Sequence, residues 1–242
     1  MKVKVVFLGG KDIGLKCLKV LYENIDNLNI ELIGVDLSPR GTSILNFIES
    51  ASITNLHGTI PPCDIIISVQ YHRVLSNKEI LKAAVCAVNL HMAPLPDYRG
   101  CNQFSFAIIN KAKEFGVTLH EITTGIDSGP IIAEDRFKIN DSIWVDELVR
   151  LSKERSLDLF ENSLPLIING KYNAINQDLL LNKRKSSFYL RRDIENIKAI
   201  DLSWDIEKID RHIRATLMPG FEGPYVMVNG RKIFFSRENS SD

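Results

Sequence analysis

Residues 88–100 have the sequence Val-Asn-Leu-His-Met-Ala-Pro-Leu-Pro-Asp-Tyr-Arg-Gly. An apolar run that ends at Leu90 predicts a buried strand, and the prolines that follow it predict a loop with a fixed backbone. Asn89 and His91 are two positions apart, so their side chains point to the same side of an extended strand. We therefore expect a polar pair at the end of a buried strand, at the edge of the core.

On the N-terminal side of this stretch, short apolar runs alternate with segments of helical periodicity. The runs predict strands at 3–8, 30–35, 64–69 and 85–90, and the periodic segments predict helices at 13–22, 43–50 and 77–84. This alternation is typical of an α/β fold with a doubly wound, mostly parallel sheet. Ligands of such sheets bind beyond the carboxyl ends of the strands, where Asn89 and His91 fall.

The C-terminal side is more varied. Helices are expected at 102–110, from an N-cap at Asp141 to about residue 164, and at 204–217, with strands at 116–122 and 131–137. A β-hairpin is expected to pair 225–228 with 232–235 through Asn229-Gly230. Composition shifts after Gly170, so we expect a larger domain over residues 1–170 and a small helix and hairpin region over residues 171–242, whose end frays from about residue 237.

Composition and charge limit the functional classes. The chain has 242 residues, of which 45% are hydrophobic, and its 30 basic and 30 acidic residues give no net charge. That balance argues against a general nucleic-acid or membrane-surface binder. The N-terminal apolar run breaks at Gly9-Gly10, too early for a signal peptide, and no apolar run approaches the roughly 18 residues of a membrane span. We expect a cytoplasmic protein with no nucleic-acid or membrane partner.

A second polar site lies in the turn around Asp127. Gly125 and Gly129 flank this aspartate, and glycine lets the backbone approach a neighbour closely. An asparagine, a histidine and an aspartate on loops of an open sheet can supply an oxyanion stabiliser, an acid or base, and a carboxylate that orients it. Asn89, His91 and Asp127 are therefore the candidate catalytic residues.

Other chemistries fit the sequence less well. The stretch 9–14, Gly-Gly-Lys-Asp-Ile-Gly, is similar to a dinucleotide-binding turn, but Lys11 occupies the position where glycine lets a pyrophosphate approach. Lys11 could instead face an anionic ligand. A Gly-x-Ser-x-Gly hydrolase elbow is absent, and the other four histidines have no metal-ligand spacing, so no metal is expected.

Four stretches resemble the folate-dependent formyltransferases: 89–91 (Asn-Leu-His), 94–100 (Pro-Leu-Pro-Asp-Tyr-Arg-Gly), 116–120 (Gly-Val-Thr-Leu-His) and 125–129 (Gly-Ile-Asp-Ser-Gly). The resemblance covers about residues 1–170 and implies a Rossmann-like catalytic domain. The catalytic Asn, His and Asp of that family fall on Asn89, His91 and Asp127. The stretch 68–73 (Ser-Val-Gln-Tyr-His-Arg) looks most like the members that act on dTDP-linked amino sugars.

The resemblance also implies substrates and further site residues. The donor would be N10-formyltetrahydrofolate, with no metal, and the acceptor a dTDP-amino-dideoxy sugar, favoured as dTDP-4-amino-4,6-dideoxyglucose, in surface polysaccharide or O-antigen synthesis. Asn89 would bind the oxyanion, His91 would act as acid or base, and Asp127 would orient it. The residues expected at the folate are Arg73, Val74, Leu75, Thr123, Thr124, Gly125, Ile126 and Asp127. Those expected at the sugar nucleotide are Lys11, Arg73, Phe221 and Tyr225.

Two alternative functions stay open. The chain could formylate another amine, such as a purine precursor or an aminoacyl-tRNA, or it could bind folate or a nucleotide without catalysis. The hairpin is apolar on both faces, with Val226, Val228, Ile233, Phe234 and Phe235, and such a hairpin needs a cover. We therefore expect the C-terminal region to bind the nucleotide and to form a homodimer, as related sugar formyltransferases do.

Overall fold

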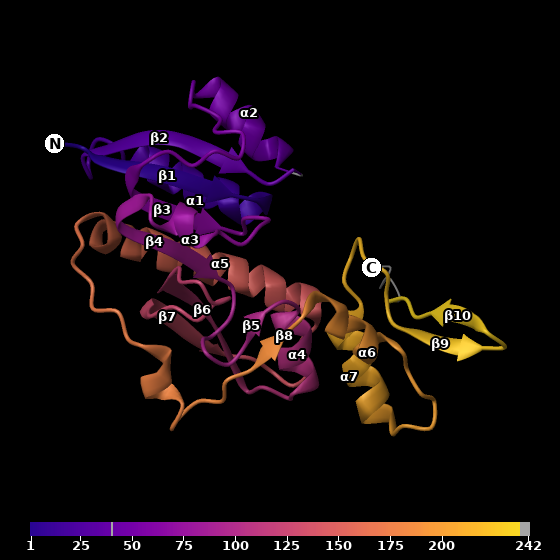
Figure 1. Cartoon of the computed structure of the whole chain (residues 1–242). Coiled ribbons are helices and arrows are strands. Elements are labelled where there is room, and N and C mark those ends of the chain that lie inside the picture. Colours follow the sequence, from indigo (N-terminus) through magenta and orange to yellow (C-terminus); the bar gives the residue numbers. More distant parts are fainter. Residues whose placement is uncertain (40, 238–242) are drawn as a thin grey trace.

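The computed structural model of the protein describes residues 1–39 and 41–237 and shows a central six-stranded sheet (Figure 1). The strand order is β2-β1-β3-β4-β6-β7, in which the first four strands are parallel and β6 and β7 are antiparallel additions. The strands are β1 (Val3–Gly9), β2 (Ile30–Leu37), β3 (Cys63–Val69), β4 (Ala83–His91), β6 (Glu114–Glu121) and β7 (Ile131–Lys138). The mostly parallel α/β fold predicted from the sequence is confirmed.

Some helices pack against the sheet, and others come after it in the chain. They are α1 (Lys11–Glu23), α2 (Thr42–Ser50), α3 (Asn77–Ile80), α4 (Gln103–Ile109) and α5 (Val145–Ile168), followed by α6 (Glu195–Lys198) and α7 (Ile206–Thr216). Because side chains alternate along a strand, Val5 and Phe7 of β1 belong to the core beneath α1 and α5, whereas Val6 and Leu8 pack on the opposite face.

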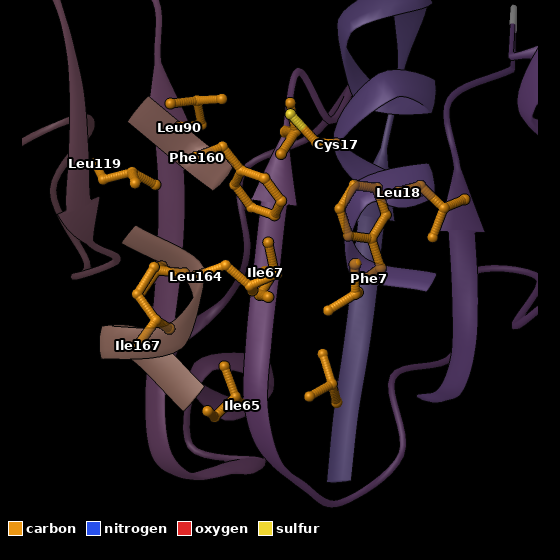
Figure 2. Packing of buried hydrophobic residues seen from close by; sticks show 14 of the residues in the cluster. Phe7, Cys17, Leu18, Ile65, Ile67, Leu90, Leu119, Phe160, Leu164 and Ile167 are labelled. Atoms are coloured by element: carbon orange, nitrogen blue, oxygen red, sulfur yellow. The ribbon is translucent and has the colours of Figure 1, made fainter. Parts of the chain in front are cut away.

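The larger core lies between the sheet and the two long helices. Phe160 and Leu164 of α5 lie against Ile67 of β3, with Leu18 of α1 beside Phe7 (Figure 2). Phe160 has no exposed surface. Truncating such a phenylalanine to alanine typically costs about 3–5 kcal/mol of stability, because a cavity remains. This packing holds the carboxyl ends of β3 and β4 in fixed positions.

The start of α5 differs from the prediction. Asp141 was expected as its N-cap, but the helix begins at Val145, after Trp144, whose N–H donates to Glu147 Oε2 at 3.2 Å. Asp141 instead pairs with Lys113, a partner distant in sequence that outcompetes the local cap. Arg237 lies over the Trp144 ring, 4.2 Å from its centroid. Residues 238–242, the rest of the end expected to fray, lie outside the described residues.

The chain after α5 returns to the sheet before it reaches the hairpin. It passes through a 3-10 helix η1 (Gln177–Leu180) and a two-residue strand β8 (Phe188–Tyr189), which pairs in parallel with β5 (Arg99–Gly100). A second 3-10 helix, η2 (Arg191–Ile194), leads into α6. The hairpin β9 (Tyr225–Val228) and β10 (Arg231–Phe234) then projects beyond α7 (Figure 1). The domain boundary at residue 170 stays a prediction.

Candidate active site

Asn89 faces His120 across two neighbouring strands. The register of β4 and β6 pairs these residues, and Asn89 Nδ2 lies 3.1 Å from His120 Nε2. His120 Nδ1 lies 2.8 Å from the carbonyl oxygen of Glu121, so Nδ1 carries the proton and Nε2 accepts from Asn89. This bond orients the carboxamide, whose second N–H is of the kind that can bind an oxyanion.

His91 is buried at the end of β4, with 5% of its surface exposed. Its Nε2 donates to the carbonyl oxygen of Tyr98 at 2.8 Å, which leaves the lone pair of the neutral ring on Nδ1. That Nδ1 lies 3.6 Å from Asp127 Oδ2. The ring is therefore oriented so that Nδ1 can receive a proton beside a carboxylate.

Asp127 lies in the turn between β6 and β7 with a backbone φ of 48°, in the left-handed region. Its Oδ2 accepts the N–H of Gly100 at 2.9 Å, and its Oδ1 lies 3.6 Å from His120 Nε2. The same turn requires Gly129, because a Cβ there would lie 1.8 Å from the carbonyl oxygen of Glu121. The structure thus brings together all three candidate catalytic residues, Asn89, His91 and Asp127.

The protonation states of this cluster follow from its surroundings. Burial alone would raise the pKa of Asp127, but attraction to the charged form of His91 and the hydrogen bond from the Gly100 N–H hold that pKa well below its usual range. Burial lowers the pKa of His91, against the opposing attraction of Asp127. Near neutral pH the site therefore holds an ionised carboxylate beside a neutral imidazole, the combination that suits a general base.

The residues expected at the folate lie on two loops that flank this cluster. Loop 73–75 follows β3 and turn 123–127 follows β6, and β4 lies between those two strands in the sheet. Leu75 is buried, whereas Val74 is 65% and Ile126 45% exposed. Arg73 forms an ion pair with Glu79 at 2.7 Å. Each of the two loops thus exposes one large apolar side chain.

A cavity of about 330 Å³ opens beside Arg73, lined in part by Asp36, His57, Tyr71 and His72. Both carboxylate oxygens of Asp36 already accept hydrogen bonds from the protein. Asp36 Oδ1 accepts the N–H of Gly58 at 3.0 Å, and Oδ2 accepts the hydroxyl of Tyr71. A dinucleotide site needs this carboxylate for the ribose, so its engagement agrees with the sequence argument against such a site.

Lys11, expected at the sugar nucleotide, lies at the turn that follows β1. Its Nζ donates to Gln70 Oε1 at 2.9 Å, and its backbone φ is 58°. Desolvation and the positive charges of Lys153 and Arg191 lower the pKa of Lys11. The three cations come from separate segments, and Lys153 is already paired with Asp12 at 2.9 Å.

Phe221 and Tyr225, the other two residues expected at the nucleotide, lie apart from the catalytic cluster. Phe221 is 72% exposed, and the ring of Tyr225 packs edge-on against Phe234 with Lys232 over its face. Figure 1 shows the hairpin on the far side of α7 from β4. Their role at a nucleotide stays a prediction.

Two residues of the site escaped the sequence argument. His120 belongs to the stretch 116–120 that carries the resemblance, but the sequence assigned it no role at the site, although the pairing of β4 with β6 sets it beside Asn89. Gln177 is 4% exposed, and its Nε2 donates to the backbone carbonyl oxygens of Asp127 and Gly129 at 3.0 and 2.7 Å. A strand-register analysis could have found His120, but no local sequence signal indicates Gln177.

Over residues 1–39 and 41–237, no three His, Cys, Asp or Glu side chains group so that they could hold a metal ion. In the same part of the chain, each helix is too short or too polar to span a membrane.

The fold and the site are those of α/β proteins that bind ligands at the carboxyl end of a mostly parallel sheet. Residues 50–159 match the formyl transferase family, so the resemblance inferred from the sequence is confirmed. The match includes Asn89, His91 and Asp127.

Curated relatives agree with this family. The chain is 30% identical over 178 residues to a bifunctional polymyxin resistance protein ArnA of Wigglesworthia glossinidia brevipalpis, covering 74% of this chain and 26% of the relative. It is 31% identical over 169 residues to a methionyl-tRNA formyltransferase of Lactobacillus acidophilus, covering 70% and 52%. It is 27% identical over 168 residues to a GDP-perosamine N-formyltransferase of Brucella melitensis, covering 69% and 62%. The chain thus spans less than two thirds of each relative.

Solved structures share the fold over nearly the whole chain. WlaRD, a sugar 3N-formyl transferase determined with dTDP and 5-N-formyl-THF, has a TM-score of 0.80 at 23% identity, covering 96% of this chain and 85% of that one. An N-formyltransferase of Helicobacter canadensis, in complex with folinic acid and dTDP-3-aminofucose, has a TM-score of 0.76 at 24% identity, covering 96% and 86%. At these identities the similarity extends to the fold.

Proposed function

We propose that the protein moves a formyl group from N10-formyltetrahydrofolate to the amine of a nucleotide-linked amino sugar. The observation that carries this proposal is the cluster of Asn89, His91 and Asp127 at the carboxyl end of β4, inside the residues that match the formyl transferase family. A carboxamide donor, a neutral imidazole and an ionised carboxylate are the groups that transfer of an acyl group to an amine requires.

The folate would lie between the two loops that flank β4. Exposed Val74 and Ile126 could contact its ring system, and backbone groups of turn 123–127 could pair with the ring edge. When bound there, the folate supplies a formyl carbon that an amine can attack. Arg73 is held by Glu79 and Tyr71, so we assign it to fixing this loop rather than to a ligand contact.

The residues of the cluster then have distinct tasks. The Asn89 carboxamide donates a hydrogen bond to the formyl oxygen as negative charge develops there. His91 Nδ1 takes the proton of the attacking amine. Asp127 stabilises the resulting imidazolium, while the Tyr98 carbonyl oxygen keeps Nε2–H in place. The imidazolium would then give the proton to N10 as the C–N10 bond breaks, so that tetrahydrofolate leaves and the formyl group stays on the acceptor amine. Removing one oxyanion donor typically costs about 100- to 1000-fold in rate.

The favoured acceptor is dTDP-4-amino-4,6-dideoxyglucose, in a pathway to surface polysaccharide or O-antigen. Three observations support this class: the sequence of residues 68–73, the fold shared with sugar formyltransferases, and the cations Lys11 and Arg191, which suit a diphosphate. The methionyl-tRNA formyltransferase among the relatives keeps aminoacyl-tRNA as the second candidate.

The test is an acceptor panel with purified protein and N10-formyltetrahydrofolate. The panel contains dTDP-4-amino-4,6-dideoxyglucose, its 3-amino isomer, a GDP-linked amino sugar and methionyl-tRNA, with formylated product measured by mass spectrometry. Formylation of the 4-amino sugar is expected. Transfer to methionyl-tRNA alone would replace the proposal with the second candidate. Folate binding without transfer to any amine would point to a non-catalytic binding protein.

The hairpin supports a second proposal, that the protein is a homodimer through its C-terminal region. Met227, Val228, Ile233 and Phe234 are each 48–57% exposed on β9 and β10. A two-stranded hairpin is marginally stable alone, and a second copy would cover these side chains. Light scattering at micromolar concentration is expected to give the mass of a dimer, and a monomer there would refute the proposal.

A further inference from the structure

The segment between α5 and β8 holds the Asp127 turn in place. Ile175 pairs with Ile131 at the start of β7 through two backbone hydrogen bonds of 2.8 Å. The next contact is made by Gln177, whose Nε2 supplies one N–H to Asp127 O and the other to Gly129 O. One neutral side chain thus ties down both ends of the catalytic turn.

The chemistry of these two bonds is specific. A primary amide nitrogen offers two N–H donors in one plane without adding charge, which lysine cannot do. Gln177 Oε1 is buried and has no hydrogen-bond partner among the described residues. Burying an acceptor without a hydrogen-bond partner is unfavourable for folding. The two hydrogen bonds that the Gln177 nitrogen donates therefore account for this side chain.

We propose that Gln177 is a positioning residue: it fixes the backbone of the turn so that the Asp127 carboxylate stays next to His91 Nδ1. This inference rests on the proposed function for its kinetic consequence, but not for its structural one. The backbone of Asp127 is in the left-handed region, which non-glycine residues rarely occupy without support from their surroundings. Without Gln177, the turn is expected to relax and carry the carboxylate away.

The separation of Asp127 from His91 has a measurable electrostatic effect. Two titratable side chains act on the charge of His91: Asp127 from the turn favours the imidazolium, and His120 from β6 opposes it. The Tyr98 carbonyl oxygen, from the loop after β4, also favours the imidazolium. If Asp127 moves away, His91 loses part of the attraction that favours its imidazolium form. Burial and His120, which both lower the pKa of His91, then lower it further.

The experiment titrates His91 by NMR in protein labelled with ¹³C-histidine, with the His91 resonance assigned by its loss in His91→Gln. Gln177→Met keeps the length of the side chain and removes both donors. We expect the pKa of His91 to fall by about 0.5–1 unit, a part of the shift that a nearby opposite charge produces. Formyl transfer is expected to lose about 10- to 100-fold in kcat, with KM values within about twofold.

Asn176→Ala is the matched control. Asn176 is the neighbouring residue and caps η1 by accepting the N–H of Asp178, without a bond to the Asp127 turn. It is expected to leave the His91 titration unchanged. Gln177→Asn keeps the amide but withdraws it by one methylene, so the pKa of His91 should fall by a smaller amount. This variant replaces Gln177→Met in the test if the methionine variant does not fold.

An unchanged His91 titration in a folded Gln177→Met protein would overturn the inference, whatever its turnover. The proposed function fails separately, if the wild-type protein formylates no member of the acceptor panel. The NMR titration needs no substrate, so the two failures are distinguishable.

Discussion

Segment 171–190 and the hairpin β9–β10 both follow the catalytic core in sequence, but they contact the rest of the protein in opposite ways. Segment 171–190 has little regular structure, yet Gln177 and Arg184 reach buried backbone carbonyls, and β8 pairs with the loop after β4. The hairpin has a regular antiparallel ladder, yet its apolar side chains are about half exposed.

Regular secondary structure and anchorage to the rest of the protein are therefore separate properties. The segment after β4, which includes β5, supplies two polar partners of the cluster, Tyr98 O for His91 and Gly100 N–H for Asp127, and β8 pairs with it. Segment 171–190 is therefore expected to affect chemistry, and the hairpin to affect association.

The largest effect is expected in the core itself. His91→Gln removes the proposed base while keeping a polar side chain, and formyl transfer should fall about 100- to 10,000-fold. Turnover by the best acceptor of the panel is the measurement, with circular dichroism as the folding control. Near-normal turnover would contradict the proposed role of His91, because the chemistry would then lie outside the cluster.

A smaller effect is expected where segment 171–190 meets the core. Arg184 donates to Leu95 O at 2.8 Å and forms a two-point ion pair with Glu134 at 3.0 and 2.9 Å. Arg184→Met should cost about 2 kcal/mol in the free energy of unfolding, since hydrogen bonds with a charged partner are lost at a largely buried site.

The matched control is Arg231→Met in β10, where the side chain is exposed. It should change the free energy of unfolding by less than about 0.5 kcal/mol. Urea denaturation measures both variants. Equal losses in the free energy of unfolding of the two variants would show that segment 171–190 is no more firmly anchored than the hairpin.

Part of the pH dependence of stability should come from the core, through His91. The folded pKa of His91 lies below its unfolded value of about 6.5, so the unfolded chain binds more protons and stability falls as pH drops below that value. His91→Gln should therefore lose less Tm than wild type between about pH 7.5 and pH 5.5. Glu222→Gln, in the exposed pair with Lys232, should keep the wild-type slope.

The smallest effect on turnover is expected in the hairpin. Ile233→Ser and Phe234→Ser replace side chains that are 53% and 48% exposed, so the monomer fold should tolerate both. Light scattering is expected to show loss of the dimer, with turnover per chain within about twofold, since the pair is far from β4. A dimer that persists in both variants would place the interface elsewhere.

The sequence predicted the sheet, and it singled out Asn89, His91 and Asp127, which the structure brings together, because both inferences rest on local signals. Apolar runs, helical spacing and glycine-flanked turns depend on residues close in the chain, and Asn89, His91 and Asp127 each carry such a signal. Gln177 and Asp141 show the limit. The partners of Gln177 are about 50 residues away, and Asp141 looks like an N-cap until Lys113 is close by.

The site of Arg237 has a practical consequence for spectroscopy. The chain has two tryptophans: Trp144 lies under Arg237, and Trp204 lies under Lys208 with His212 beside it. Both indole rings therefore contact the C-terminal region, and neither is in the catalytic cluster. Intrinsic fluorescence will report whether that region is docked, and a change on adding nucleotide sugar would reveal movement there even when the acid–base cluster is unaltered.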